Sequence, residues 1–210
     1  MYTPPLIPEN KQDFELPVPH YVQRDNTGGQ GYRECNLTAC ASVTQYLTGA
    51  LDPEYKAAGF REPEDVYATV LAKHGDTTDH AAQTRAMRDF GIESYFSYNM
   101  AINELAEVVR RGFPVVIGTD YKASGHMVTV YGMYENGFRV LCPNGIRQGS
   151  TDWWVERFGN ENDAKADLFS FGLMKKIFTV NHYDDGWGRI ITAVNGEKTS
   201  LHPDILGKAI

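Results

Sequence analysis

The first half of the chain carries apolar residues at helical spacing. After Cys35, apolar side chains recur every three or four positions until Gly49, which predicts a helix closed by that glycine. Three further stretches show the same spacing and end beside a glycine, and they predict helices over residues 63–75, 78–90 and 99–112. The N-terminal half is therefore expected to be mainly helical.

The pattern changes after residue 112. Short apolar runs of β type cover residues 114–118, 127–134, 138–141, 173–180 and 189–194. Asn136-Gly137 predicts a hairpin turn between two of these runs, because both residues readily adopt positive φ. Helices followed by an antiparallel sheet indicate the α+β class.

Prolines crowd the beginning of the chain. Five of them lie within residues 1–19, which predicts an extended arm packed on the surface. Residues 20–23 resemble a short strand that leads into a glycine-rich loop. We therefore expect the arm over 1–19, one domain over 20–180, and a C-terminal extension over 181–210 packed on the same domain.

Length, composition and charge narrow the class of protein. The 210 residues are 42% hydrophobic, which is sufficient for one sizeable core. A net charge of -7 argues against nucleic acid as a partner and gives no attraction to anionic membranes. No apolar run approaches a membrane span, and no secretory signal is visible at the N-terminus. We expect a soluble protein that is made in the cytoplasm and does not insert stably into membranes. The sequence leaves open whether it acts at a cell wall or in a virion. It also leaves the oligomeric state open.

Cys35 is the strongest candidate for chemistry. It precedes the apolar stripe of its helix, so the positive end of that helix would favour the thiolate, which is the nucleophilic form. His126 follows Gly125 at the start of an apolar strand and is the candidate base. The Gln23 side-chain amide and the Cys35 backbone N–H would donate hydrogen bonds to an oxyanion.

Cysteine has two other common roles, as a small buried apolar side chain and as a zinc ligand. Cys40 shares the apolar face of the helix and fits a small buried hydrophobe. A zinc site through Cys35 and Cys40 is at the edge of the usual ligand spacing, but no second close Cys/His pair follows in the sequence. We therefore expect neither a metal nor an organic cofactor.

These residues together resemble a known family. Gln23-Arg24-Asp25-Asn26, Cys35-Asn36-Leu37-Thr38, Gly125-His126 and a hairpin ending in Pro143 and Gly145 are similar to the bacteriocin-processing peptidases, family thirty-nine of the papain-fold cysteine peptidases, and to their stand-alone relatives in bacteria and phages. The similarity covers residues 18–145. It implies a papain-like fold in which a helical lobe carries the cysteine and an antiparallel sheet carries the histidine. It also implies Gln23 as oxyanion donor, Cys35 as nucleophile and His126 as base.

One position departs from the family pattern. Where the family usually has an aspartate that orients the histidine, this sequence has Cys142. Asn144 lies two residues further on, and an amide oxygen is sufficient in papain-like Cys-His-Asn sites, so Asn144 is expected to complete the site. Asp120 and Asp152 are weaker substitutes.

The sequence therefore predicts an enzyme that hydrolyses an amide bond through a cysteine thioester. The resemblance favours a peptide substrate, and a phage or bacterial enzyme that cleaves the peptide part of peptidoglycan is the finer hypothesis. A catalytically impaired papain-fold module that binds a peptide or a larger particle is one alternative, which Cys142 favours. Acyl transfer on the same scaffold is another.

Four aromatic residues have two possible roles. They either stack on sugar rings or cover the edge of the core: Trp153, Trp154, Tyr183 and Trp187.

Overall fold

A computed structural model describes residues 1–4, 12–120, 125–144, 156–157 and 167–206. Its helices are η1 (Gly31–Arg33), α1 (Cys35–Thr48), α2 (Leu51–Ala58), α3 (Pro63–Leu71), α4 (His80–Asp89), α5 (Ile102–Arg110), α6 (Phe171–Ile177) and α7 (Pro203–Leu206). Its strands are β1 (Phe14–Glu15), β2 (Ile92–Met100), β3 (Val115–Thr119), β4 (His126–Tyr134), β5 (Gly137–Leu141), β6 (Glu156–Arg157), β7 (Asp167–Ser170), β8 (Gly186–Val194) and β9 (Glu197–Lys198). No helix within these described ranges has the length and apolar character needed to cross a bilayer.

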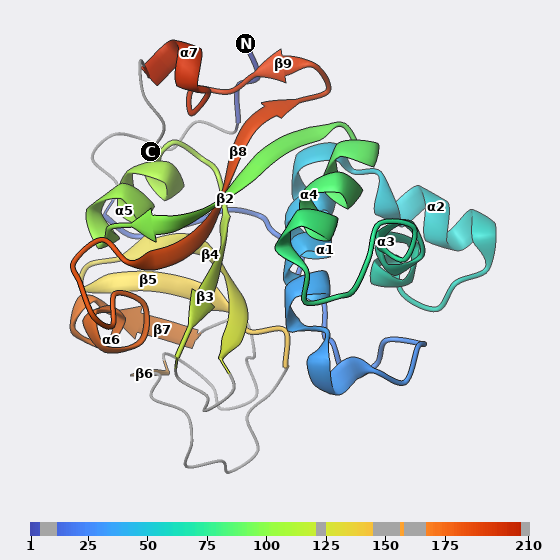
Figure 1. Ribbon diagram of the computed structural model, residues 1–210, viewed down its shortest axis with the longest axis horizontal. Coiled ribbons are helices and arrows are strands. Elements are labelled where there is room, and N and C mark those ends of the chain that lie inside the picture. Colours follow the sequence, from blue (N-terminus) through green and yellow to red (C-terminus); the bar gives the residue numbers. More distant parts are fainter. Residues whose placement is uncertain (5–11, 121–124, 145–155, 158–166, 207–210) are drawn as a thin grey trace.

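The strands form one antiparallel sheet that separates two groups of helices. Its order is β2-β8-β3-β4-β5-β7-β6, with β1 added to β4 and β9 added to β8. Figure 1 shows α1, α2, α3 and α4 together on the right of the sheet, and α5 and α6 on its left. A helical lobe that begins with Cys35 thus faces a sheet that carries His126, as expected for the α+β, papain-like class.

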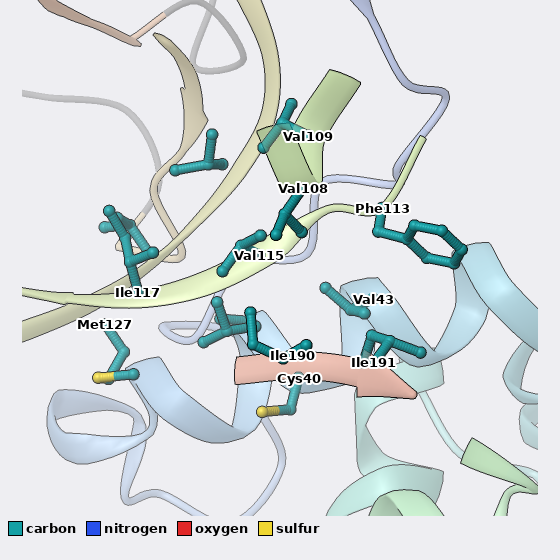
Figure 2. Packing of buried hydrophobic residues seen from close by; sticks show 14 of the residues in the cluster. Cys40, Val43, Val108, Val109, Phe113, Val115, Ile117, Met127, Ile190 and Ile191 are labelled. Atoms are coloured by element: carbon teal, nitrogen blue, oxygen red, sulfur yellow. The ribbon is translucent and has the colours of Figure 1, made fainter. Parts of the chain in front are cut away.

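Helix α1 is the centre of the helical lobe because it is buried on nearly every side. Residues 36–44 are all buried, so the helix has no wide polar face to turn toward water. Figure 2 shows Cys40 and Val43 of this helix packed against Ile190 and Ile191 of β8. This packing fixes the axis of α1 and therefore the position of Cys35 at its first turn.

The predicted helices are confirmed, with shorter bounds. The helix after Cys35 ends where expected, because Gly49 adopts the left-handed conformation at φ 66° and its N–H bonds the carbonyl of Gln45 at 2.8 Å. The stretches predicted over 63–75, 78–90 and 99–112 contain α3, α4 and α5. Helix α2 and strand β2 were not expected from the sequence.

Two strand predictions are wrong. Residues 173–180 were expected as a strand, but the apolar side chains of Leu173, Met174 and Ile177 face the core from helix α6. Ser170 caps that helix by accepting a hydrogen bond from the Leu173 N–H at 3.1 Å, a local signal that outweighs the short apolar run. Residues 20–23 have no strand partner and form an irregular segment.

The two ends of the chain are tied into the sheet. In the arm, Phe14 pairs with Met133, and the Asp13 carboxylate accepts a 2.7 Å hydrogen bond from the buried guanidinium of Arg139. Residues 181–210 were expected as an extension packed on the domain. Strand β8 of that segment lies between β2 and β3 in the sheet, and its Ile190, Ile191 and Val194 side chains are buried in the core.

Candidate active site

Cys35 is the first residue of α1, and its side chain is half-buried. The first backbone bond of the helix runs from the Thr38 N–H to the Glu34 carbonyl at 2.9 Å, so helix formation does not use the Cys35 N–H. Cys40, by contrast, is fully buried, and burial raises the pKa of its thiol. Position within the same helix therefore separates a cysteine at a pocket from a cysteine of the core.

His126 is the first residue of β4. Gly125 precedes it at φ 72°, a conformation that suits glycine, and the Thr119 hydroxyl donates to the His126 carbonyl at 2.9 Å. The His126 side chain is buried, with 6% of its surface exposed. Cys35 and His126 both line one pocket of about 440 Å³, so the fold brings together the two residues that the sequence singled out.

The group that contacts the His126 imidazole differs from the sequence expectation. The Nε2 atom of His126 lies 3.4 Å from the Sγ atom of Cys142, whose side chain has no exposed surface. Asn144, which was expected to orient the imidazole, accepts a 2.8 Å hydrogen bond from Nε of Arg24 through its Oδ1 atom. The Asn144 amide oxygen is therefore engaged with Arg24, and the group beside Nε2 of His126 is a thiol.

Gln23 is almost completely buried, and it is not one of the described residues that line the pocket. Its backbone N–H bonds the Pro143 carbonyl at 2.7 Å, which joins the glutamine segment to the end of the histidine hairpin. Its side-chain amide donates to the Gly31 carbonyl in the loop that leads to Cys35. A carboxamide has two N–H donors, so one of them remains for a second acceptor.

The weaker candidates for an orienting acid fall in different places. Asp120 lines the pocket and is exposed, and its backbone N–H bonds the Ile177 carbonyl at 2.8 Å. Asp152 lies outside the described residues, as do Trp153 and Trp154. Within the described ranges, no three His, Cys, Asp or Glu side chains are grouped so as to hold a metal ion.

His80 is a pocket residue that the sequence reasoning missed. Its ring stacks on Phe96 with centroids 3.7 Å apart and lies in the pocket with Cys35. Its Nδ1 atom is 3.3 Å from the Nδ2 atom of Asn36, the residue after the cysteine. One sequence feature could have indicated this position. His80 follows Asp79, which caps α4, and a residue at a helix start can face a cleft.

Aromatic side chains form part of the pocket wall. Trp187 and Tyr98 are 46% and 50% exposed, and their ring centroids are 5.2 Å apart in an edge-to-face arrangement. Both residues line the pocket. Tyr183 is 81% exposed on the surface. In the described part of the chain, Tyr183 thus faces solvent, whereas Trp187 is about half exposed and packs against other rings of the pocket.

Comparison with known proteins gives one match over most of the chain. The family model described as the Peptidase_C39 like family matches residues 15–166, more than two thirds of the sequence. The search of curated proteins with this sequence gave no match.

Two solved structures are similar to this chain. One is a double glycine motif protease from an AMS/PCAT transporter in complex with the leader peptide, at 18% identity, covering 84% of this chain and 92% of that chain, with a TM-score of 0.47. The other is a candidate C39-like peptidase from Bacillus anthracis, at 13% identity, covering 87% of this chain and 98% of that chain, with a TM-score of 0.49. Both TM-scores are below 0.5, so the family match carries the comparison.

Proposed function

Because the chain belongs to the Peptidase_C39 like family of cysteine peptidases, we propose that it hydrolyses an amide bond of a peptide through a thioester on Cys35. The family expected from the sequence motifs is thereby confirmed. One observation carries the proposed mechanism: Cys35 at the start of α1 and His126 at the start of β4 line the same pocket.

The proposed reaction has two steps. The Cys35 thiolate attacks the carbonyl carbon, a C–S bond forms, and the C–N bond breaks as the His126 imidazolium gives its proton to the leaving amine. Water then attacks the thioester, the imidazole takes up a proton from the water, and the C–S bond breaks to release the acid. The Cys35 N–H and the second N–H of the Gln23 amide are proposed to donate to the oxyanion in both steps.

The orienting role is assigned to Cys142 on the basis of its contact with Nε2 of His126. A neutral thiol fixes the ring by a weak hydrogen bond but does not stabilise an imidazolium as a carboxylate does. The same contact favours the second candidate function, a papain-fold module that binds a peptide and turns it over slowly or not at all.

The peptide part of peptidoglycan is the substrate that we propose to test first. Tyr98 and Trp187 offer exposed aromatic faces at the pocket, and Tyr183 offers one on the surface. Aromatic faces of this kind pack against sugar rings, which accompany the peptide in that polymer. Cleavage of other peptides by the same pocket is the broader form of the proposal.

The decisive experiment compares wild type with Cys35→Ala on purified peptidoglycan and on fluorescein-labelled casein. New amino termini that are released only by wild type support the hydrolase, and the substrate that yields them identifies the class. Equal release by both proteins would rule out Cys35 as the nucleophile. Binding of peptidoglycan without release by either protein would favour the binding module.

A further inference from the structure

His80 is held rigidly in the pocket that contains Cys35. It opens helix α4 after Asp79, whose carboxylate accepts from the Ala81 N–H at 2.7 Å. Its ring lies flat on Phe96, with an interplanar angle of 12°. Its carbonyl accepts a 2.9 Å hydrogen bond from Nη2 of Arg189. The imidazole therefore has a fixed plane and a fixed orientation before any substrate arrives.

The hydrogen bonds around Asn36 determine which nitrogen of His80 carries the proton. The buried Cys40 thiol lies 3.6 Å from Oδ1 of Asn36 and donates to it, because burial keeps that thiol protonated. The Asn36 amide nitrogen, a donor only, is then directed at Nδ1 of His80. Nδ1 must accept, so the proton of the neutral ring is on Nε2.

Burial and the positive charge of Arg189 keep His80 neutral. They lower the pKa of His80 to about 4, and Asp79 opposes them only in part. Arg189 is itself 1% exposed, and its Nη1 donates to the hydroxyls of Thr84 and Ser94 at 2.7 and 3.2 Å. At neutral pH the ring is a fixed, uncharged donor, a form that suits an uncharged acceptor such as a carbonyl oxygen.

We propose that the Nε2–H of His80 donates a hydrogen bond to a backbone carbonyl of the peptide bound beside Cys35, and that Tyr98 and Trp187 form the apolar wall of the same subsite. Among the described residues, the imidazole makes its hydrogen bond with Asn36 through Nδ1, which leaves Nε2 for a ligand in the pocket. The ring centroids of Tyr98 and Trp187 each lie 6.2 Å from the His80 ring centroid, in an edge-to-face arrangement. The His80 donor and the apolar wall therefore adjoin each other.

The charges of the pocket indicate which peptides this subsite accepts. Asp120 and Asp185 line the pocket that contains the subsite, and their carboxylates disfavour an acidic side chain. An apolar residue fits the wall formed by Tyr98 and Trp187. The subsite is therefore assigned to a peptide segment with an apolar rather than an acidic side chain. This assignment rests on the proposed use of Cys35 as the reactive thiol.

The test measures binding without turnover. The apolar aldehyde acetyl-Leu-Leu-norleucinal adds reversibly to an active-site thiol and should protect Cys35 from iodoacetamide, which mass spectrometry of the Cys35 peptide can follow. His80→Phe keeps a planar ring on Phe96 but has no donor, and we expect its half-protecting concentration to rise about tenfold, the value of one hydrogen bond. His80→Gln restores an N–H near the Nε2 position and should stay within about threefold of wild type.

Matched probes and variants separate the possible outcomes. The acidic aldehyde acetyl-Asp-Glu-Val-aspartinal should protect wild type at least about tenfold less well than the apolar one. Equal protection of wild type and a folded His80→Phe, or equal loss in His80→Phe and His80→Gln, overturns the donor role. Failure of the apolar aldehyde to protect wild type overturns the subsite. Wild type that is protected as expected but cleaves neither casein nor peptidoglycan refutes the hydrolase and leaves the subsite supported.

Discussion

Nε2 of His126 lies 3.4 Å from Sγ of Cys142, and this contact places a thiol where a papain-like site uses a carboxylate or an amide. Cys142 is fully buried, so solvent does not compete for the contact. A neutral thiol adds no negative charge beside the imidazole, and the thiolate–imidazolium pair with Cys35 is therefore less stabilised than it would be beside a carboxylate. The strength of the proposed peptidase should depend on this one side chain.

Replacing Cys142 by aspartate should strengthen the site. A carboxylate at Nε2 favours the imidazolium, so in Cys142→Asp we expect iodoacetamide to label Cys35 at a lower pH and kcat/KM on casein to rise roughly tenfold. Cys142→Ala removes the contact and should lower kcat/KM by a similar factor. Thermal unfolding of each variant serves as the control. A folded Cys142→Asp that labels no faster than wild type would contradict the orienting role.

The three cysteines should react in a set order. Cys35 is half-buried at the pocket, whereas Cys40 and Cys142 have no exposed surface. Only the thiolate reacts, and burial raises the pKa of the Cys40 thiol. In the native protein we expect iodoacetamide to modify Cys35 before the other two, as measured by mass spectrometry of the cysteine peptides. All three should react in guanidinium chloride, and early modification of Cys40 would contradict the proposed site.

A methyl group at Gly31 should disturb the glutamine loop. A Cβ atom there would collide with the Gln23 backbone carbonyl, whereas one at Gly28 would meet only Oε1 of Glu34 at 3.7 Å. Gly31→Ala must shift the Gln23 segment, and we expect a loss of about 1–3 kcal/mol in the free energy of unfolding and a fall in kcat/KM on casein. Gly28→Ala is the matched control and should behave as wild type in urea titration and in the assay.

Stability should fall with rising pH because of Glu64. Burial, and secondarily the nearby Asp25 and Glu62 carboxylates, raise the pKa of Glu64 to about 8, while the unfolded chain has the ordinary value of 4.5. Between these values the folded protein binds the additional proton, so its stability decreases as pH rises from about 4.5 to about 8.

Glu64→Gln removes this titration and keeps the shape of the side chain. The variant should therefore be more stable than wild type at pH 8, by a few kcal/mol, on the order expected for a shift of this size. At pH 4 the difference should nearly vanish. Urea titrations at the two pH values measure it, and an equal difference at both would show that Glu64 does not titrate in this range.

Local patterns in the sequence were sufficient to predict helices α1, α3, α4 and α5 and strands β3, β4, β5 and β8. Helix α1 is confirmed from Cys35 to its glycine cap because apolar spacing and a left-handed glycine act within a few residues. The short apolar run over residues 173–180 predicts a strand, whereas helix α6 forms there, because so short a run fits either period and the Ser170 cap favours the helix.

The sequence by itself determined which reactive groups are present, namely a thiol at a helix start and an imidazole at a strand start. It also determined the family motif around them. The tertiary structure alone decided which groups meet, namely Cys142 at His126, Asn144 at Arg24, and His80 in the pocket beside Cys35. Cys142 meets His126 because β4 and β5 pair as neighbouring strands, whereas the contacts of Asn144 with Arg24 and of His80 with Asn36 join segments farther apart along the chain. An imidazole that was sealed away from the pocket, or a Cys35 that solvent could not reach, would refute the mechanism built on them.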